Sequence, residues 1–157
     1  MESFDKSISN INNDSYKGIW KHHYENITTS NIEHILGQKD SCFLKCDIDG
    51  GEYEILDYLI NNSYRFTGVV IEFHDINIQN NFNDLTNFIS KFGLRLIHTH
   101  VNNYSYIIDE YKNYYITVIE LSFSNFKINT RLSNNTIMPN KLDMPNNPND
   151  DEFKLNF

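Results

Sequence analysis

The fold is decided by residues 43–56, Phe43-Leu44-Lys45-Cys46-Asp47-Ile48-Asp49-Gly50-Gly51-Glu52-Tyr53-Glu54-Ile55-Leu56, in a chain of 157 residues. The apolar start of this stretch predicts a buried strand over residues 42–47. Two carboxylates one residue apart and two glycines follow, and the remainder continues as an amphipathic helix. In open α/β sheets, ligands bind just beyond the carboxyl ends of the strands. Asp47 and Asp49 are therefore the first candidate site residues.

The acidic turn has a structural and a functional interpretation. Asp49 is a suitable helix N-cap, and Glu52 stands three residues later, which is the spacing of a capping box. Gly50 and Gly51 allow the chain to turn where a Cβ atom would interfere. Asp47 precedes the cap and is not explained in this way. Both interpretations stay open for the two aspartates.

The rest of the chain alternates helices with strands. A helix over residues 29–37 carries the capping-box pair Ser30 and Glu33, and the helix after the acidic turn ends near residues 61–62. A strand over 68–74, a helix over 82–92, a strand over 94–101, a loop over 104–113 and a strand over 115–123 follow. One apolar face is expected for the 82–92 helix, made of Phe82, Leu85, Phe88, Ile89 and Phe92. This order predicts parallel βαβ units and an antiparallel last pair of strands.

Polar side chains gather where the predicted strands end. Alternate residues of a strand share a face, so His98 and His100 point the same way. The carboxyl ends of the three parallel strands should converge on one rim. Carboxylates, imidazoles and amides on such a rim suit acid–base chemistry on a hydroxyl group. The expected rim residues are Asp47, Asp49, Glu72, His74, Asp75, His98, His100, Asn102 and Asn103, of which His98 is the one more readily explained as an interior residue.

Residues 44–52 resemble the Lys-Ile-Asp-Val-Glu-Gly-x-Glu signature of FkbM-type S-adenosylmethionine-dependent methyltransferases. Asp47, Asp49 and Gly50 match the Asp, first Glu and Gly of the signature, and Glu52 matches its second Glu. Residues 69–74, 97–103 and 118–123 are similar to the strands that follow in this family. Residues 138–148 resemble the tails of one subgroup. The resemblance covers about residues 27–157.

The resemblance implies a Rossmann-like methyltransferase sheet with a reversed last strand, and O-methylation of a hydroxyl acceptor, often a sugar or polyketide. S-adenosylmethionine is the implied cofactor. We predict catalytic roles for Asp47, Asp49, His74 and His100, and substrate binding by Glu72, Asp75, Asn102 and Asn103. Residues 1–26 are expected to be irregular, residues 27–125 to form a partial methyltransferase domain, and residues 126–157 to form an extended tail packed on it.

The usual cofactor-binding βαβ unit is not visible in the sequence. The chain has six glycines, and none forms a G-x-G turn before a helix. Residues 1–40 are too few to hold that unit as well as the helix already placed there. We therefore expect a truncated, split or degenerate copy, and the cofactor-binding residues stay unknown. The strand over 42–47 would then be a bare sheet edge, which predicts self-association or pairing with a partner that carries the N-terminal half.

Two other function classes stay open. A strand that ends in Asp47-Ile48-Asp49 also fits a metal-dependent glycosyltransferase acting on a nucleotide sugar, and the chain could be a non-catalytic remnant that serves in assembly. A divalent ion held by Asp47, Asp49 and His74 is the less favoured alternative to a metal-free site.

Composition limits the class of protein. The net charge of -8 and the lack of clustered Lys and Arg argue against nucleic-acid binding. No apolar run is long enough to cross a bilayer and no signal peptide is visible, which predicts a cytoplasmic protein. Cys42 and Cys46 would lie roughly 13 Å apart on one strand, too far for a disulfide, and are expected to be buried thiols.

Overall fold

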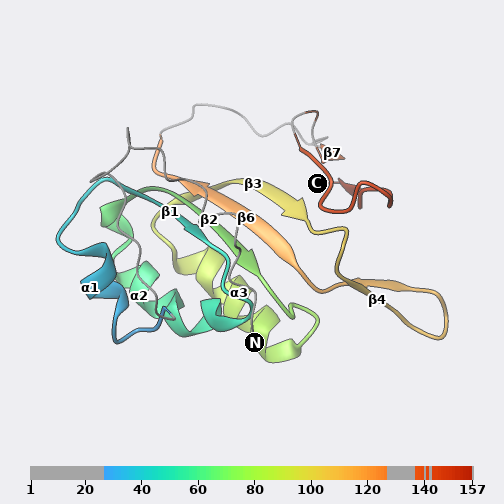
Figure 1. Cartoon of the computed structure of the whole chain (residues 1–157), viewed down its shortest axis with the longest axis horizontal. Helices are drawn as coiled ribbons and strands as arrows, with labels where there is room; N and C mark the ends of the chain where they lie inside the picture. The colour runs from blue at the N-terminus through green and yellow to red at the C-terminus, as the bar shows by residue number, and fades with distance from the viewer. Residues whose placement is uncertain (1–26, 127–136, 140, 142, 157) are drawn as a thin grey trace, which may run out of the picture.

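A four-stranded mixed sheet forms the centre of the protein (Figure 1). The computed structural model describes residues 27–126, 137–139, 141 and 143–156, so the expected irregular segment 1–26 lies outside the described residues. The strand order is β1-β2-β6-β3, with β1 (Cys42–Cys46), β2 (Phe66–Phe73), β6 (Ile119–Ser124) and β3 (Arg95–Val101). β1 and β2 are parallel, and β6 is antiparallel to both β2 and β3. The carboxyl ends of β1, β2 and β3 therefore point the same way.

This topology confirms the predicted α/β class and the antiparallel pairing of the last two long strands. β6 reaches its place between β2 and β3 because the chain returns through a hairpin and not through a helix. The hairpin consists of β4 (Tyr106–Ile108) and β5 (Tyr114–Ile116), which pair antiparallel. The expected loop over 104–113 is therefore wrong in part, and the expected single strand over 115–123 is divided between β5 and β6 (Ile119–Ser124). Asp109 closes the turn, because its carboxylate accepts the backbone N–H groups of Tyr111 and Asn113.

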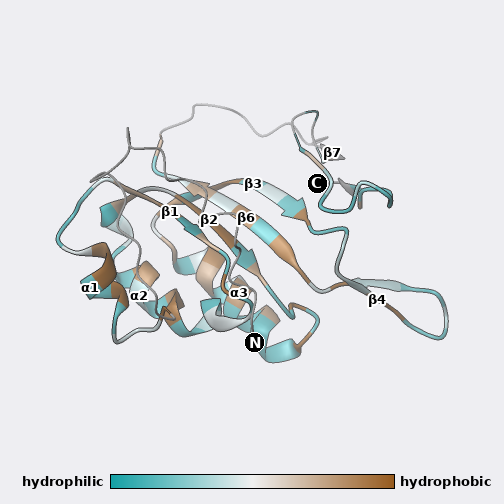
Figure 2. Ribbon diagram, in the orientation of Figure 1, coloured by the Kyte–Doolittle hydropathy of each residue, from teal (hydrophilic) through white to brown (hydrophobic). Residues whose placement is uncertain are grey.

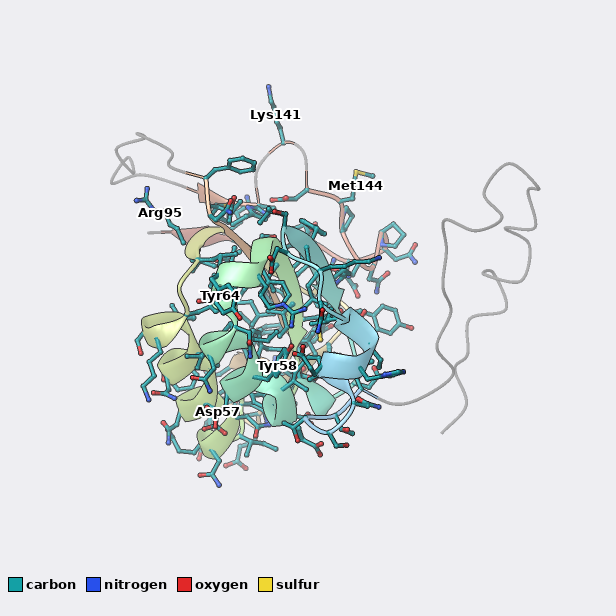
Figure 3. The ribbon with its side chains drawn as sticks, turned by 90° about the vertical axis from the view of Figure 1, so that its left-hand side faces the viewer. Asp57, Tyr58, Tyr64, Arg95, Lys141 and Met144 are labelled. Carbon is teal, nitrogen blue, oxygen red and sulfur yellow. The ribbon has the colours of Figure 1, made fainter. Side chains whose placement is uncertain are left out.

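Helices cover one face of the sheet, and the C-terminal segment lies over the other. The helical layer contains α1 (Ile32–Leu36), η3 (Gly51–Ile55), α2 (Leu56–Asn61), η4 (Ser63–Arg65) and α3 (Gln79–Lys91). β7 (Ile137–Met138) and β8 (Leu155–Asn156) belong to the C-terminal segment. Figure 3 shows Lys141 and Met144 of this segment on the opposite side of the sheet from Asp57 and Tyr58 of α2. Met144 is exposed.

The core lies between the sheet and the helices. Val69, Ile71 and Phe73 alternate along β2 and are fully buried, and Phe88 of α3 packs against Phe73. Burial of this apolar surface is the main driving force for docking the helices. Figure 2 shows the division: β2 is hydrophobic along its middle, whereas the ends of β2 and β3 are hydrophilic.

Two details of the expected helices are corrected. The N-cap of α1 is Asn31 and not Ser30. Leu85 and Phe88 of α3 and its C-cap residue Phe92 are buried as expected, but Phe82 is 48% and Ile89 37% exposed. Three buried positions at i, i+3 and i+7 already form the stripe that faces the sheet, and the outer two residues fall outside it.

β1 is an edge strand among the described residues, because its backbone pairs with β2 on one side. Cys42, Leu44 and Cys46 pack against the core on the helix side, and both cysteines are free thiols. Cys46 is buried as expected, whereas Cys42 is only partly buried, so the prediction of two buried thiols is wrong for Cys42. Burial, followed by the charges of Glu52 and Asp47, raises the pKa of the Cys46 thiol to about 12. Pairing of this edge with a second chain stays a prediction.

Among the described residues, none of the helices is both long enough and apolar enough to cross a lipid bilayer.

Candidate active site at the ends of β1 and β2

A cluster of polar side chains lies where β1 and β2 end. The parallel register pairs Cys46 with Ile71, so Asp47 and Glu72 follow side by side on the face away from the helices. His74 comes directly after β2 on the same face. Five of the eight predicted catalytic and substrate-binding residues meet here: Asp47, Asp49, Glu72, His74 and Asn102.

The imidazole of His74 is surrounded by carboxylates. Its Nε2 atom lies 3.9 Å from Asp47 Oδ1 and 3.7 Å from Asp49 Oδ1. Its Nδ1 atom lies 3.3 Å from Glu52 Oε1. The Asp47 and Asp49 side chains are 47% and 87% exposed, whereas that of Glu52 is 0% exposed. One ring nitrogen therefore faces the interior and the other faces solvent.

Glu52 holds this arrangement in place. Its Oε1 atom accepts the backbone N–H of His74 at 2.6 Å, and its Oε2 atom accepts that of Gly50 at 2.9 Å. The hydroxyl of Tyr53 donates to the carbonyl oxygen of His74 at 2.6 Å. A buried carboxylate with two charge-assisted hydrogen bonds fixes the turn and the end of β2 relative to each other. His74 is thus positioned through its backbone as well as its ring.

The capping box predicted for Asp49 and Glu52 is wrong, because the Glu52 carboxylate bonds to the backbone of Gly50 and His74 instead. Asp49 is not the N-cap, because Gly50 takes that position with φ 96°, and Asp49 itself has φ 50°. Glu52 turns inward to reach two separate backbone N–H groups instead of capping Asp49. The spacing of Glu52 from Asp49 indicated a capping residue, so Glu52 was not among the predicted site residues. Its match to the second Glu of the FkbM signature was the available signal.

Glu72 has an unusual electrostatic environment. Burial raises its pKa, and the negative charge of Asp47 raises it further, whereas the hydrogen bond from Asn102 opposes the shift. The Asn102 side-chain amide donates to Glu72 Oε1 at 2.8 Å and reaches past β6 to do so. Glu72 therefore holds a proton to a higher pH than an ordinary glutamate.

The same cluster has the composition of a divalent-cation site. Asp47, Glu72 and His74 each offer one ligand atom, and these atoms lie within 4.8 Å of one another. Carboxylate and imidazole ligands suit several divalent metals. The alternative raised from the sequence used Asp49 as the third ligand, whereas the structure groups Glu72 with Asp47 and His74.

The other three expected residues lie outside this cluster. Asp75 is exposed beyond β2, with φ 51°. His100 Nε2 lies 3.3 Å from Glu152 Oε1 in the C-terminal segment. Asn103 is fully buried, accepts the N–H of Asn147 at 2.7 Å, and donates to two carbonyl oxygens, of Asn147 and Asp150. His100 and Asn103 thus contact the C-terminal segment, while their predicted roles in catalysis and binding stay predictions.

The comparison with protein-family models agrees with the signature at the acidic turn. The family model described as "Methyltransferase FkbM domain" matches residues 2–96, which contain β1, β2, the acidic turn and four of the five clustered residues. No curated protein and no solved structure matches the chain. The resembling stretches 97–103, 118–123 and 138–148 lie beyond the matched range. Since the family model covers more than half of the sequence, this chain belongs to the FkbM family of methyltransferases.

Proposed function

We propose that the cluster at the ends of β1 and β2 is the acceptor side of an S-adenosylmethionine-dependent O-methyltransferase. Family membership supports methyl transfer, and S-adenosylmethionine is the cofactor that this family generally uses. When bound, it supplies an electrophilic methyl group. The observation that carries the proposal is the position of His74, between buried Glu52 on one side and exposed Asp47 and Asp49 on the other.

In this proposal, His74 is the general base. When Nδ1 carries the proton and donates it to Glu52, the lone pair of Nε2 faces the solvent side of the cluster. A hydroxyl group placed there gives its proton to Nε2, and its oxygen becomes the nucleophile. The carboxylates of Asp47 and Asp49, each within 4 Å of Nε2, stabilise the imidazolium that forms. Asp47 also accepts a hydrogen bond from the acceptor and orients it.

Two backbone N–H groups of the glycine turn, those of Gly50 and Gly51, are not available to the cofactor. The backbone N–H groups of a glycine turn such as the one after β1 are suited to bind a carboxylate or phosphate. Here both already donate hydrogen bonds within the protein. That of Gly50 bonds to Glu52 Oε2, and that of Gly51 bonds to the carbonyl oxygen of Ile48 at 3.1 Å. The steps derived above therefore concern the acceptor side alone. A sugar hydroxyl is the acceptor class that the family resemblance suggests.

The test is transfer of a labelled methyl group from S-adenosylmethionine to a panel of sugars and polyols, combined with calorimetric titration of the cofactor. Loss of the base in His74→Asn should lower the transfer rate by about 100-fold or more. His34→Asn is the matched control, because His34 is an exposed histidine on α1. Its rate should equal that of the unmodified chain.

Two results would contradict the proposal. Unchanged transfer by His74→Asn would show that another group takes the proton. A folded chain that binds no S-adenosylmethionine at millimolar concentration would show that this chain alone is not the enzyme.

A further inference from the structure

The cluster at the ends of β1 and β2 brings three metal-ligating side chains together. Asp47, Glu72 and His74 each offer one ligand atom, and these atoms lie within 4.8 Å of one another. The distance from Asp47 Oδ1 to His74 Nε2 is 3.9 Å. Metal bonds of about 2.1 Å in a tetrahedral site place neighbouring ligand atoms roughly 3.4 Å apart. The Asp47 side chain is half-exposed, so a small rotation closes the difference.

The ring of His74 is held as a metal-ligating imidazole is held. Such a ring donates its second N–H group to a carboxylate or a carbonyl oxygen, and this partner fixes the tautomer and the ring orientation. Here Nδ1 lies 3.3 Å from Oε1 of Glu52, whose side chain is fully buried. Glu52 is not one of the three ligands, so this contact is independent of the cluster itself. With the proton on Nδ1, the Nε2 atom presents its lone pair to the cluster.

Glu72 forms the buried end of the site. The residue is 9% exposed, and the side-chain amide of Asn102 donates to its Oε1 atom at 2.8 Å. No Lys, Arg, amide or hydroxyl group of the described residues donates a hydrogen bond to its other oxygen, Oε2. A buried carboxylate with an unpaired oxygen is costly. A cation bound between Glu72 and the solvent side would remove this cost.

The charges around Glu72 also favour a cation. Asp47 follows β1 directly beside Glu72, so two carboxylates face the same point. Lys45, two residues before Asp47, donates to Glu120 at 2.8 Å. Among the ion pairs that the described residues form, none joins a Lys or Arg to Asp47 or Glu72. A divalent ion supplies the positive charge that this part of the chain lacks.

We propose that Asp47, Glu72 and His74 bind a divalent transition-metal ion of the Zn²⁺ type. An imidazole nitrogen favours Zn²⁺ over Mg²⁺, which prefers oxygen ligands. Three protein ligands leave one position of a tetrahedral ion for water. The geometry selects Glu72 as the third ligand, because it stands on β2 two residues before His74 and beside Asp47.

The bound ion regulates the proposed methyl transfer, and this consequence rests on the proposed function. A metal at His74 Nε2 takes the lone pair that otherwise accepts the proton of the acceptor hydroxyl. The metal-bound state and the state with a free base therefore exclude each other. We expect Zn²⁺ to inhibit transfer and a chelator to restore it.

Metal binding is measured on the full chain without cofactor or acceptor. The chain is labelled with ¹⁵N, freed of metal with a chelator and titrated with zinc chloride, while the imidazole nitrogen signals are recorded. We expect one equivalent of Zn²⁺ to shift the Nε2 signal of His74, while Nδ1 keeps its proton. Calorimetric titration gives the affinity, and magnesium chloride should bind at least about tenfold more weakly.

Two substitutions separate the three ligands from general acidity. Glu72→Gln keeps the shape of the side chain, removes one ligand charge and should weaken Zn²⁺ binding by about tenfold or more, since even changes behind the ligands have effects of this size. Asp75→Asn removes an equal charge from an exposed residue next to His74 that is not one of the three ligands. Its affinity for Zn²⁺ should equal that of the unmodified chain.

The proposal is overturned if the ring signals of His74 do not change at millimolar Zn²⁺, or if Zn²⁺ shifts the rings of His98 and His100 instead. Both results come from the unmodified chain and do not depend on the folding of a variant. Zn²⁺ binding at His74 without any methyl transfer would retain the metal site and contradict the proposed function. Methyl transfer without Zn²⁺ binding would do the reverse. Transfer that is unchanged at saturating Zn²⁺ would contradict the regulation.

Discussion

The two faces of the four-stranded sheet are built from the same strands but have opposite chemistry. On the helix side, Ile71, Phe73, Leu121 and Phe123 are at most 2% exposed. On the other side, the alternate positions carry charged or titratable residues, among them Lys45, Glu72, His98, His100 and Glu120. Strand alternation keeps the two sets separate. One face stabilises the fold, and the other can hold charges because it stays partly open to water.

The face of the sheet away from the helices, called the open face below, is itself divided into two halves. At β3, each histidine faces one carboxylate of the C-terminal segment: His98 Nε2 lies 2.9 Å from Asp143 Oδ1, and His100 faces Glu152. At β1 and β2, His74 faces several carboxylates that belong to the sheet and its turn. The histidines of β3 contact the C-terminal segment, whereas His74 leaves its Nε2 atom available on the solvent side. This difference is why we place proton transfer at His74.

The largest change in the free energy of unfolding is expected for a substitution on the helix face of the sheet. Phe88 is fully buried and contacts the rings of Phe73, Phe92 and Phe123. Phe88→Ala should lower the free energy of unfolding by about 3–5 kcal/mol, because it removes buried area and leaves a cavity. Urea-induced unfolding measures this change. Phe82→Ala, in the same helix but at a half-exposed position, is the matched control and should cost about 1 kcal/mol. Equal losses would contradict the division between the faces.

An intermediate change in the free energy of unfolding is expected at Glu52, which lies in the turn after β1, where the two faces meet. Glu52→Gln replaces a buried acceptor of two backbone N–H groups by an amide with one acceptor oxygen. Its free energy of unfolding should fall by about 2 kcal/mol, because one buried N–H is left unpaired. Asp47→Asn changes an exposed carboxylate and should alter stability by no more than about 0.5 kcal/mol.

Activity measurements on Glu52→Gln and Asp47→Asn sharpen the contrast between a residue that holds the turn and one that orients the acceptor. Both should lose most methyl transfer, since Glu52 orients His74 and Asp47 orients the acceptor. Unfolding curves and transfer rates, measured on the same preparations, separate the two roles. A Glu52→Gln variant as stable as Asp47→Asn would show that Glu52 does not hold the turn.

The smallest effect is a pH dependence on the open face. Burial and the charge of Asp47 raise the pKa of Glu72 in the folded state above its ordinary value of 4.5. The folded chain therefore binds this proton more tightly than the unfolded chain, and stability falls as pH rises from about 4.5 through the raised pKa. Glu72→Gln cannot titrate. Its stability relative to the unmodified chain should thus increase with pH across this window, as measured by urea unfolding at several pH values. If the difference in stability between Glu72→Gln and the unmodified chain stays constant with pH, the pKa of Glu72 is not raised by folding.

Periodicity and turn chemistry predicted most of the fold. The long strands and the helices could be placed because their apolar spacing is local. The β4–β5 hairpin was missed because its strands, Tyr-Ile-Ile and Tyr-Tyr-Ile, are only three residues long and show no clear alternation of polar and apolar residues. Phe82 was assigned to the core because helical spacing fixes a face but not which turns of that face meet the sheet. The acidic turn was misjudged because local spacing favoured a cap.

The sequence alone determined the α/β class, the FkbM signature and the residues that reach the ends of β1 and β2, since each depends on neighbours within a few positions. Tertiary structure decided what those residues contact. Glu52 bonds to His74, 22 residues away, and Asn102 bonds to Glu72, 30 residues away. His100 meets Glu152, 52 residues away. Such contacts depend on strand order and on where the C-terminal segment docks, and packing of the whole chain sets both.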